Sequence, residues 1–247
     1  MTPLAPQPCH YVIFHPDDSR EALTISGSAL VNGSVQDWTG TVWVDAPGGN
    51  EDPFVLCEHW LYSYCHANAL RRKPRSSPFV SRGSHLFFCS GDAAELGQLQ
   101  VDTVFLVGHV AEWRTDPHRL PLEFQPHHDN AGSELWLRHL RFGFPGPPGH
   151  HTGAYTYVAQ MWSSSVEAYS FLPIDCNGER VTAELGSFGA NLARAIRQNV
   201  WGKYPVMLSQ ERQDELLGRI RGLTSVSVIG IGTRRAGLAV GGGHHRC

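Results

Sequence analysis

The chain has 247 residues, of which 41% are hydrophobic, 10% aromatic and 17% charged, with a net charge of −3. This composition excludes a disordered chain and a coiled coil. No apolar run approaches the roughly 18 residues of a membrane helix, and segment 1–7 lacks the features of a signal peptide, so we expect a cytoplasmic protein with no membrane partner.

Short apolar runs bounded by turn residues predict a series of strands along the chain. In chain order these strands are expected at 11–14, 22–31, 40–44, 83–91, 101–110, 155–162, 168–174 and 225–231. The run at 101–110, VDTVFLVGHV, gives the strongest strand signal. Segment 114–153 is rich in Pro, Gly and His, and we expect a long excursion over the surface there, which is typical of functional loops.

Three segments carry a helical pattern. At about 55–70, apolar residues recur with the spacing of one helix face, at Cys57, Trp60, Leu61, Tyr64 and Cys65. Two further helices are expected near the C-terminus, at 185–200 and 209–223. Ser209 is a suitable N-cap for the second, and Glu211 suits its first turn.

Together these elements predict an α+β fold. We expect a single domain over 8–223, built on a mixed sheet or a small β-barrel, with a helix at about 55–70 and two C-terminal helices. Residues 224–247 are expected to form a last strand and a flexible, Gly-rich tail. The oligomeric state does not follow from the sequence.

Charge is strongly segregated along the chain. Residues 1–58 carry one cation and eight acids, and residues 92–193 carry five cations and twelve acids. The segment 59–91 instead carries five cations and no acid, at Arg71, Arg72, Lys73, Arg75 and Arg82. A segment of this kind is typical of a surface that binds a polyanion, and it predicts a nucleic-acid partner, RNA (including tRNA) or modified DNA.

Two predicted strands follow the basic segment and carry aromatic and polar side chains. We expect a pocket for a base at this place, formed by Phe87, Phe88, Asp102, His109 and Trp113. Stacking of a base on an aromatic ring contributes about 1–3 kcal/mol. An aromatic pocket beside a basic segment would therefore read an unpaired or modified base.

The order of these features resembles the PUA-like superfamily, in particular the EVE, ASCH and nucleotide-modification-associated domains. The resemblance rests on the basic run Arg71-Arg72-Lys73-Pro74-Arg75, the strand Gly83-Ser84-His85-Leu86-Phe87-Phe88, and the apolar strand that ends at Trp113. It implies a PUA-like barrel core at about 54–175 and a role in nucleic-acid binding. Ser84 stands where these domains usually have an acid.

An enzymatic alternative uses the end of the predicted strand 83–91. Cys89 and Ser90 stand where nucleophiles are often displayed, and Glu112, at the end of the next predicted strand, is an acid that could act as a general base beside the expected pocket. With a tRNA partner, these residues suggest an enzyme that transfers an aminoacyl group from tRNA, by cyclodipeptide-synthase-like or aminoacyltransferase chemistry. A third class of function is a partner-binding protein without chemistry that uses segment 114–153.

A second enzymatic alternative starts from His15-Pro16-Asp17-Asp18, directly after the first strand. These four residues resemble the signature of the LmbE-like (PIG-L-type) zinc de-N-acetylases. The resemblance implies that His15 and Asp18 bind zinc and that Asp17 is the general base, with His151 as the third ligand. No cofactor is expected in the nucleic-acid-binding interpretation, and zinc is expected only in this alternative.

Overall fold

The structure is a computed structural model, and it describes residues 8–16, 20–45, 53, 55, 60–63, 70, 80–91, 98–112, 155–184 and 205–231. Its strands are β1 (His10–Pro16), β2 (Arg20–Val31), β3 (Ser34–Asp45), β4 (Leu61–Ser63), β5 (His85–Gly91), β6 (Gln98–Glu112), β7 (Tyr155–Ala159), β8 (Leu172–Ile174), β9 (Val181–Glu184), β10 (Val206–Leu208) and β11 (Val226–Ile231). The helix of the described part is α5 (Gln210–Leu223).

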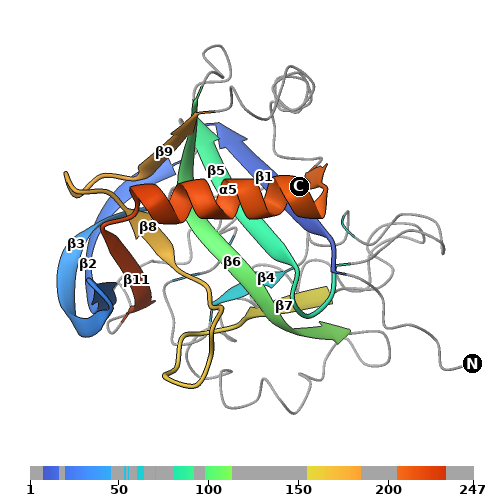
Figure 1. The fold of residues 1–247 in the computed structure, drawn as a ribbon, viewed down its shortest axis with the longest axis horizontal. Helices are drawn as coiled ribbons and strands as arrows, with labels where there is room; N and C mark the ends of the chain where they lie inside the picture. The colour runs from blue at the N-terminus through green and yellow to red at the C-terminus, as the bar shows by residue number, and fades with distance from the viewer. Residues whose placement is uncertain are drawn as a thin grey trace, which may run out of the picture.

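The strands form two open sheets (Figure 1). The seven-stranded sheet has the order β10-β1-β5-β6-β7-β4, and β9 pairs with the first residues of β6. The four-stranded sheet has the order β3-β2-β11-β8. Strands β1 and β5 are parallel neighbours, so their carboxyl ends lie at the same edge of the large sheet.

The two faces of the large sheet build two apolar clusters because side chains alternate along each strand. The inner cluster lies between the two sheets and contains Tyr11, Phe88, Phe105 and Tyr157 together with β2 and β3 residues such as Val42. The outer cluster contains β1, β5, β6 and β9 residues of the opposite face, and it packs against Leu216 and Ile220 of α5. In Figure 1, α5 crosses in front of β1, β5 and β6.

The predicted α+β class is wrong, because the described chain is mostly strand, with one helix and no closed barrel. The helix expected at about 55–70 is contradicted by β4, which pairs with β7 in the register Tyr62↔Tyr157. Trp60, Leu61 and Tyr62 are successive residues and all are buried, whereas an amphipathic helix buries one face. Cys57, Tyr64 and Cys65, and the helix expected at 185–200, lie outside the described residues.

The predicted helix at 209–223 is confirmed as α5, with Ser209 as its N-cap and Glu211 in its first turn. The Ser209 hydroxyl accepts a hydrogen bond from the Arg212 backbone N–H, which satisfies one of the free donors at the helix start. Strands were also predicted correctly at β1, β2, β3, β5, β6, β7, β8 and β11, with shifted ends. Strands β4, β9 and β10, of three or four residues each, were not predicted.

Two glycines should respond in opposite directions to alanine. Gly27 in β2 lies against β11, where an added methyl group would collide with the Gly230 carbonyl oxygen, so we expect Gly27→Ala to lower the free energy of unfolding by about 1–3 kcal/mol. Gly218 lies in α5 with open space around it, so Gly218→Ala should raise that free energy by about 0.5–1 kcal/mol. Urea unfolding of both variants checks the pair, and equal effects would contradict this packing of β2 on β11.

Candidate functional site

The predicted basic segment is described at its borders. Leu70 and Val80 are buried in the inner cluster, with exposed fractions of 2% and 0%. Arg82 follows in the turn before β5 and is exposed. Arg71, Arg72, Lys73 and Arg75 lie outside the described residues. The chain on both sides of these four cations is therefore held by the core.

The predicted pocket residues are not brought together. Phe87 and Phe88 are both fully buried, but they belong to opposite faces of the large sheet, Phe87 to the outer cluster and Phe88 to the inner cluster. Phe88 makes edge contacts with Tyr62 and Phe105, with ring centroids 5.0 and 6.1 Å apart. These contacts are core packing, and they leave neither phenylalanine a face for stacking on a base.

The polar members of the predicted pocket are also separated. His109 lies exposed in the second half of β6, whereas Asp102 is buried near the start of that strand. Seven residues of extended strand span roughly 23 Å, so these two side chains do not share one site. Trp113 lies outside the described residues.

The parallel pair β1 and β5 brings together two motifs that the sequence suggested separately. His15 is the register partner of Ser90, and Pro16 is that of Gly91. His15 is 7% exposed and its ring stacks on Phe88 at 6.4 Å. The end of the first motif therefore lies beside the end of the Cys89-Ser90 motif, at an edge where parallel strands often carry functional side chains.

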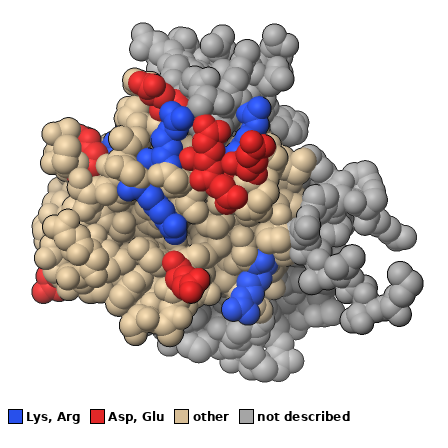
Figure 2. All heavy atoms as spheres, in the orientation of Figure 1, with Lys and Arg blue, Asp and Glu red and all other residues tan. Residues whose placement is uncertain are grey.

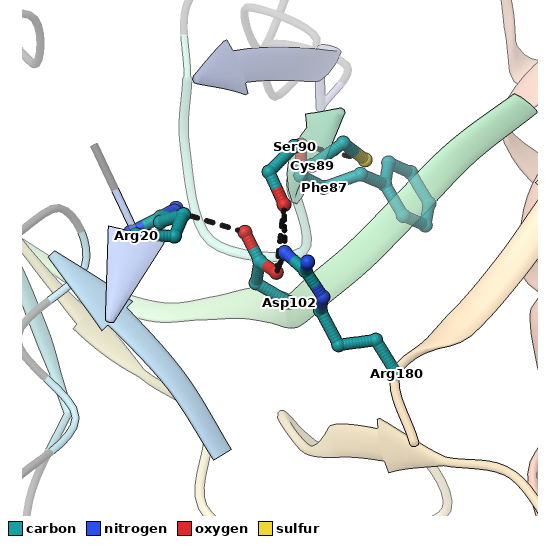
Figure 3. A network of polar contacts seen from close by, with 6 residues as sticks. All are labelled: Arg20, Phe87, Cys89, Ser90, Asp102 and Arg180. Carbon is teal, nitrogen blue, oxygen red and sulfur yellow. Dashed lines mark hydrogen bonds and ion pairs between the residues drawn. The ribbon is translucent and has the colours of Figure 1, made fainter. Parts of the chain in front are cut away.

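Four polar residues meet next to this edge (Figure 3). The Ser90 hydroxyl donates to Asp102 Oδ1 at 3.0 Å and accepts from Arg180 Nη1 at 2.6 Å. Arg180 Nη1 also lies 3.2 Å from Asp102 Oδ1, and Arg20 Nε lies 3.0 Å from Asp102 Oδ2. We call Arg20, Ser90, Asp102 and Arg180 the polar network.

A β-bulge in β6 aims Asp102 at this network. Phe88 pairs with Thr103 and Cys89 pairs with Val101, so Asp102 is the extra residue on β6. The bulge also lets Val101 and Val104 face the same outer cluster although they are three residues apart. An insertion of one residue redirects a side chain in this way, and such bulges are common next to functional sites.

The polar network joins elements of both sheets. Arg20 opens β2 of the small sheet, Ser90 and Asp102 belong to the large sheet, and Arg180 precedes β9 and lies over the Trp43 ring at 5.0 Å. The side chains of Arg20 and Asp102 are 3% and 1% exposed. Burial, the largest influence, raises the pKa of the Asp102 carboxyl, while the two guanidiniums and the Ser90 hydroxyl act to lower it.

The Ser90 hydroxyl donates to a carboxylate, as the hydroxyl of a nucleophilic serine donates to its base, but it also accepts from a guanidinium, which occupies a lone pair of the oxygen. However, Ser90 is fully buried, and its hydroxyl is occupied by both partners. In this conformation the polar network therefore fastens the two sheets to each other. In the sequence, the signal for the polar network was the single acid Asp102 within an apolar strand, since a buried carboxylate requires cationic or hydrogen-bonding partners. Arg20 and Arg180 carry no such signal.

Cys89 is a core thiol. It is fully buried, its side chain faces the outer cluster, and its Sγ donates to the Phe87 carbonyl oxygen at 3.6 Å. Burial raises the pKa of the thiol well above its ordinary value. A thiol that stays protonated is a poor nucleophile. Glu112 ends β6 opposite Tyr155, and nothing further is described of its side chain.

Among the residues that the structure describes, no three His, Cys, Asp or Glu side chains form a group able to hold a metal ion. Asp17, Asp18 and His151 lie outside that part of the chain, so the zinc alternative stays a prediction. No helix in the described ranges is long and apolar enough to cross a membrane. The chain matches no protein-family model, no curated protein and no solved structure.

Proposed function

We propose that this protein binds nucleic acid through the phosphate backbone, using the basic segment at 71–75 together with Arg82. The observation that carries the proposal is the run of 33 residues, 59–91, with five cations and no acid in a chain whose net charge is −3. Phosphate contacts supply most of the sequence-independent affinity of nucleic-acid-binding proteins.

The borders of the segment support this proposal. Nine residues separate Leu70 from Val80, and both of these are buried in the inner cluster. No acid stands among these four cations in the sequence, and charged side chains are rarely buried without a partner, so an anionic ligand would suit them. Three of the four are arginines, whose planar guanidinium can hold a phosphate by two hydrogen bonds.

The face covered by α5 serves as a contrast. Cations and acids are intermixed on this face (Figure 2), and α5 itself carries Glu211, Asp214 and Glu215 beside Arg212, Arg219 and Arg221. Arg219 pairs with Glu215 at 3.3 Å. Mixed charges of this kind give little net attraction for a polyanion, so the proposed contact does not include α5.

The experiment compares two sets of substitutions for binding of total tRNA and of a DNA duplex. Replacing Arg71, Arg72, Lys73 and Arg75 by glutamine should weaken binding of either ligand at least about tenfold, because phosphate contacts are lost. The control replaces two cations of α5, Arg212 and Arg219, by glutamine and should leave the affinity within about twofold. Equal losses in both variants would show that net charge alone, and not the basic segment, attracts the ligand.

A further inference from the structure

Two histidines lie next to each other where the first turn of α5 meets the large sheet. His10 opens β1 and His85 opens the neighbouring strand β5, and their ring centroids are 5.6 Å apart. His10 is 4% exposed, and His85 stacks on Phe87 at 6.0 Å. This pair lies at the opposite end of β5 from Ser90, and it takes no part in the proposed nucleic-acid contact.

The hydrogen bonds of His10 require a neutral ring. The His85 backbone N–H donates to His10 Nδ1 at 3.1 Å, so Nδ1 acts as an acceptor and carries no proton. His10 Nε2 is then the protonated nitrogen and donates to Gln210 Oε1 at 3.1 Å. A protonated His10 would place an N–H at Nδ1 against the backbone N–H of His85, and this hydrogen bond would be lost.

His10 connects directly to the start of the helix. Gln210 is the first residue of α5, and its Nε2 donates to Gln213 Oε1 at 2.7 Å and to Asp214 Oδ1 at 3.0 Å. His10 is also the register partner of Leu208 in β10, the strand just before α5. The neutral ring of His10 therefore ties the first turn of α5 to β1, next to the place where the backbone of His10 pairs with β10.

The surroundings of His85 oppose a positive charge on its ring. Burial is the largest influence and lowers the pKa of His85 to about 4; His10, whenever it is protonated, and Arg221 act in the same direction, and Asp214 acts against them. The pKa of His10 is also lowered, chiefly by burial, although Gln210 and Asp214 favour its charged form. The described residues of β10, Val206, Met207 and Leu208, add no titratable group.

We propose that His10 and His85 form an acid-sensitive latch, which releases β10 and the first turns of α5 from the large sheet when the pH falls below neutral. Both rings are neutral in the closed latch. Opening exposes them to water, where histidine binds a proton below a pH of about 6.5. Closing then loses free energy as the pH falls from about 6.5 toward about 4, the value of closed His85.

The test is amide hydrogen exchange of the full chain at a pH of about 7 and about 4.5, corrected for the intrinsic exchange rate. The pKa difference at His85 predicts that protection of the first half of α5 falls at least about tenfold at acid pH. Protection in the β2–β3 hairpin should change by less than about threefold. A helix that keeps its protection at acid pH would overturn the proposal.

Variants separate the latch from general acid unfolding. His10→Asn with His85→Leu removes both titrating rings, and its α5 protection should no longer depend on pH. His109→Asn removes a histidine that lies exposed on β6, and it should keep the full pH dependence of the unmodified protein. An unchanged pH dependence in the double variant, or an equal loss of protection in α5 and the hairpin, would overturn the latch.

Discussion

Replacing Asp102 by alanine is expected to lower the free energy of unfolding by about 3–5 kcal/mol, because it removes one partner of a buried ion pair. The carboxylate contacts Arg20 at 3.0 Å and Arg180 at 3.2 Å and accepts from the Ser90 hydroxyl at 3.0 Å. Such a loss is a large part of the free energy of unfolding of a typical domain, which is about 5–15 kcal/mol. Urea unfolding followed by tryptophan fluorescence measures it.

The matched control is the exposed pair on α5. Arg219 and Glu215 lie 3.3 Å apart, with side chains 34% and 38% exposed, and Arg219→Ala should cost no more than about 0.5 kcal/mol. Ser90→Ala should fall between the two, at about 1–3 kcal/mol, since it removes a hydroxyl that both donates to Asp102 and accepts from Arg180. If Asp102→Ala unfolded like Arg219→Ala, the polar network would not hold the two sheets together.

Replacing Phe88 by alanine is expected to lower the free energy of unfolding by about 3–5 kcal/mol. The ring is fully buried and packs on Tyr62, Phe105 and His15, so the substitution removes a large apolar side chain from the middle of the inner cluster. The tRNA affinity of the folded fraction should stay within about twofold, because the ring is closed to any ligand. Unfolding curves and a binding titration at low temperature give the two numbers.

The comparison between Phe88 and an exposed apolar residue separates packing from binding. Val35 is 45% exposed on β3, and Val35→Ala should change the free energy of unfolding by no more than about 0.5 kcal/mol. If Phe88→Ala left the stability nearly unchanged but abolished the tRNA affinity, the result would instead support the aromatic pocket that the sequence suggested.

Much of the fold could be predicted from local patterns. Strand β6 reads as a strand because its apolar residues form a long run bounded by polar ones, and α5 reads as a helix because Ser209 and Glu211 mark its start. The observed strand ends differ from the predicted ones by several residues. A strand ends where its pairing ends, and this pairing depends on residues that are distant in sequence. The hairpin of β2 and β3 continues to Val31 and Ser34, around Asn32 and Gly33, which both have positive φ angles.

The failures have a common physical origin in long-range pairing. The apolar spacing around Trp60 fits a helix face, yet β7 offers an edge with which Leu61–Ser63 pairs. The β-bulge at Asp102 depends on the pairing of β6 with β5, and the sequence of β6 alone does not predict it. Arg20 and Arg180 meet at Asp102 from positions that are far apart in sequence, so their partnership could not be predicted from spacing.

The candidate site follows the same division. The sequence correctly indicated polar residues at the end of β5 and at Asp102. It also predicted that Phe87, Phe88 and His109 share their site, but Phe87 and Phe88 lie on opposite faces of the large sheet, and His109 lies far along β6 from Asp102. The pattern of a strand predicts which of its residues point to the same face of the sheet. Whether another layer covers that face depends on the topology of the whole chain. The prediction of a basic segment needs only the count of charged residues and no knowledge of strand pairing. The functional proposal rests on this segment.

The most direct test of that proposal is the affinity for total tRNA across a series of salt concentrations. If the four cations at 71–75 and Arg82 contact phosphates, the logarithm of the binding constant should fall linearly with the logarithm of salt concentration, with a slope of about −3.5 to −4.5. The variant without the four cations keeps Arg82 and should have a slope of only about −0.7 to −0.9. No measurable affinity even at low salt, or the same slope in the variant and the unmodified protein, would contradict the proposed nucleic-acid contact.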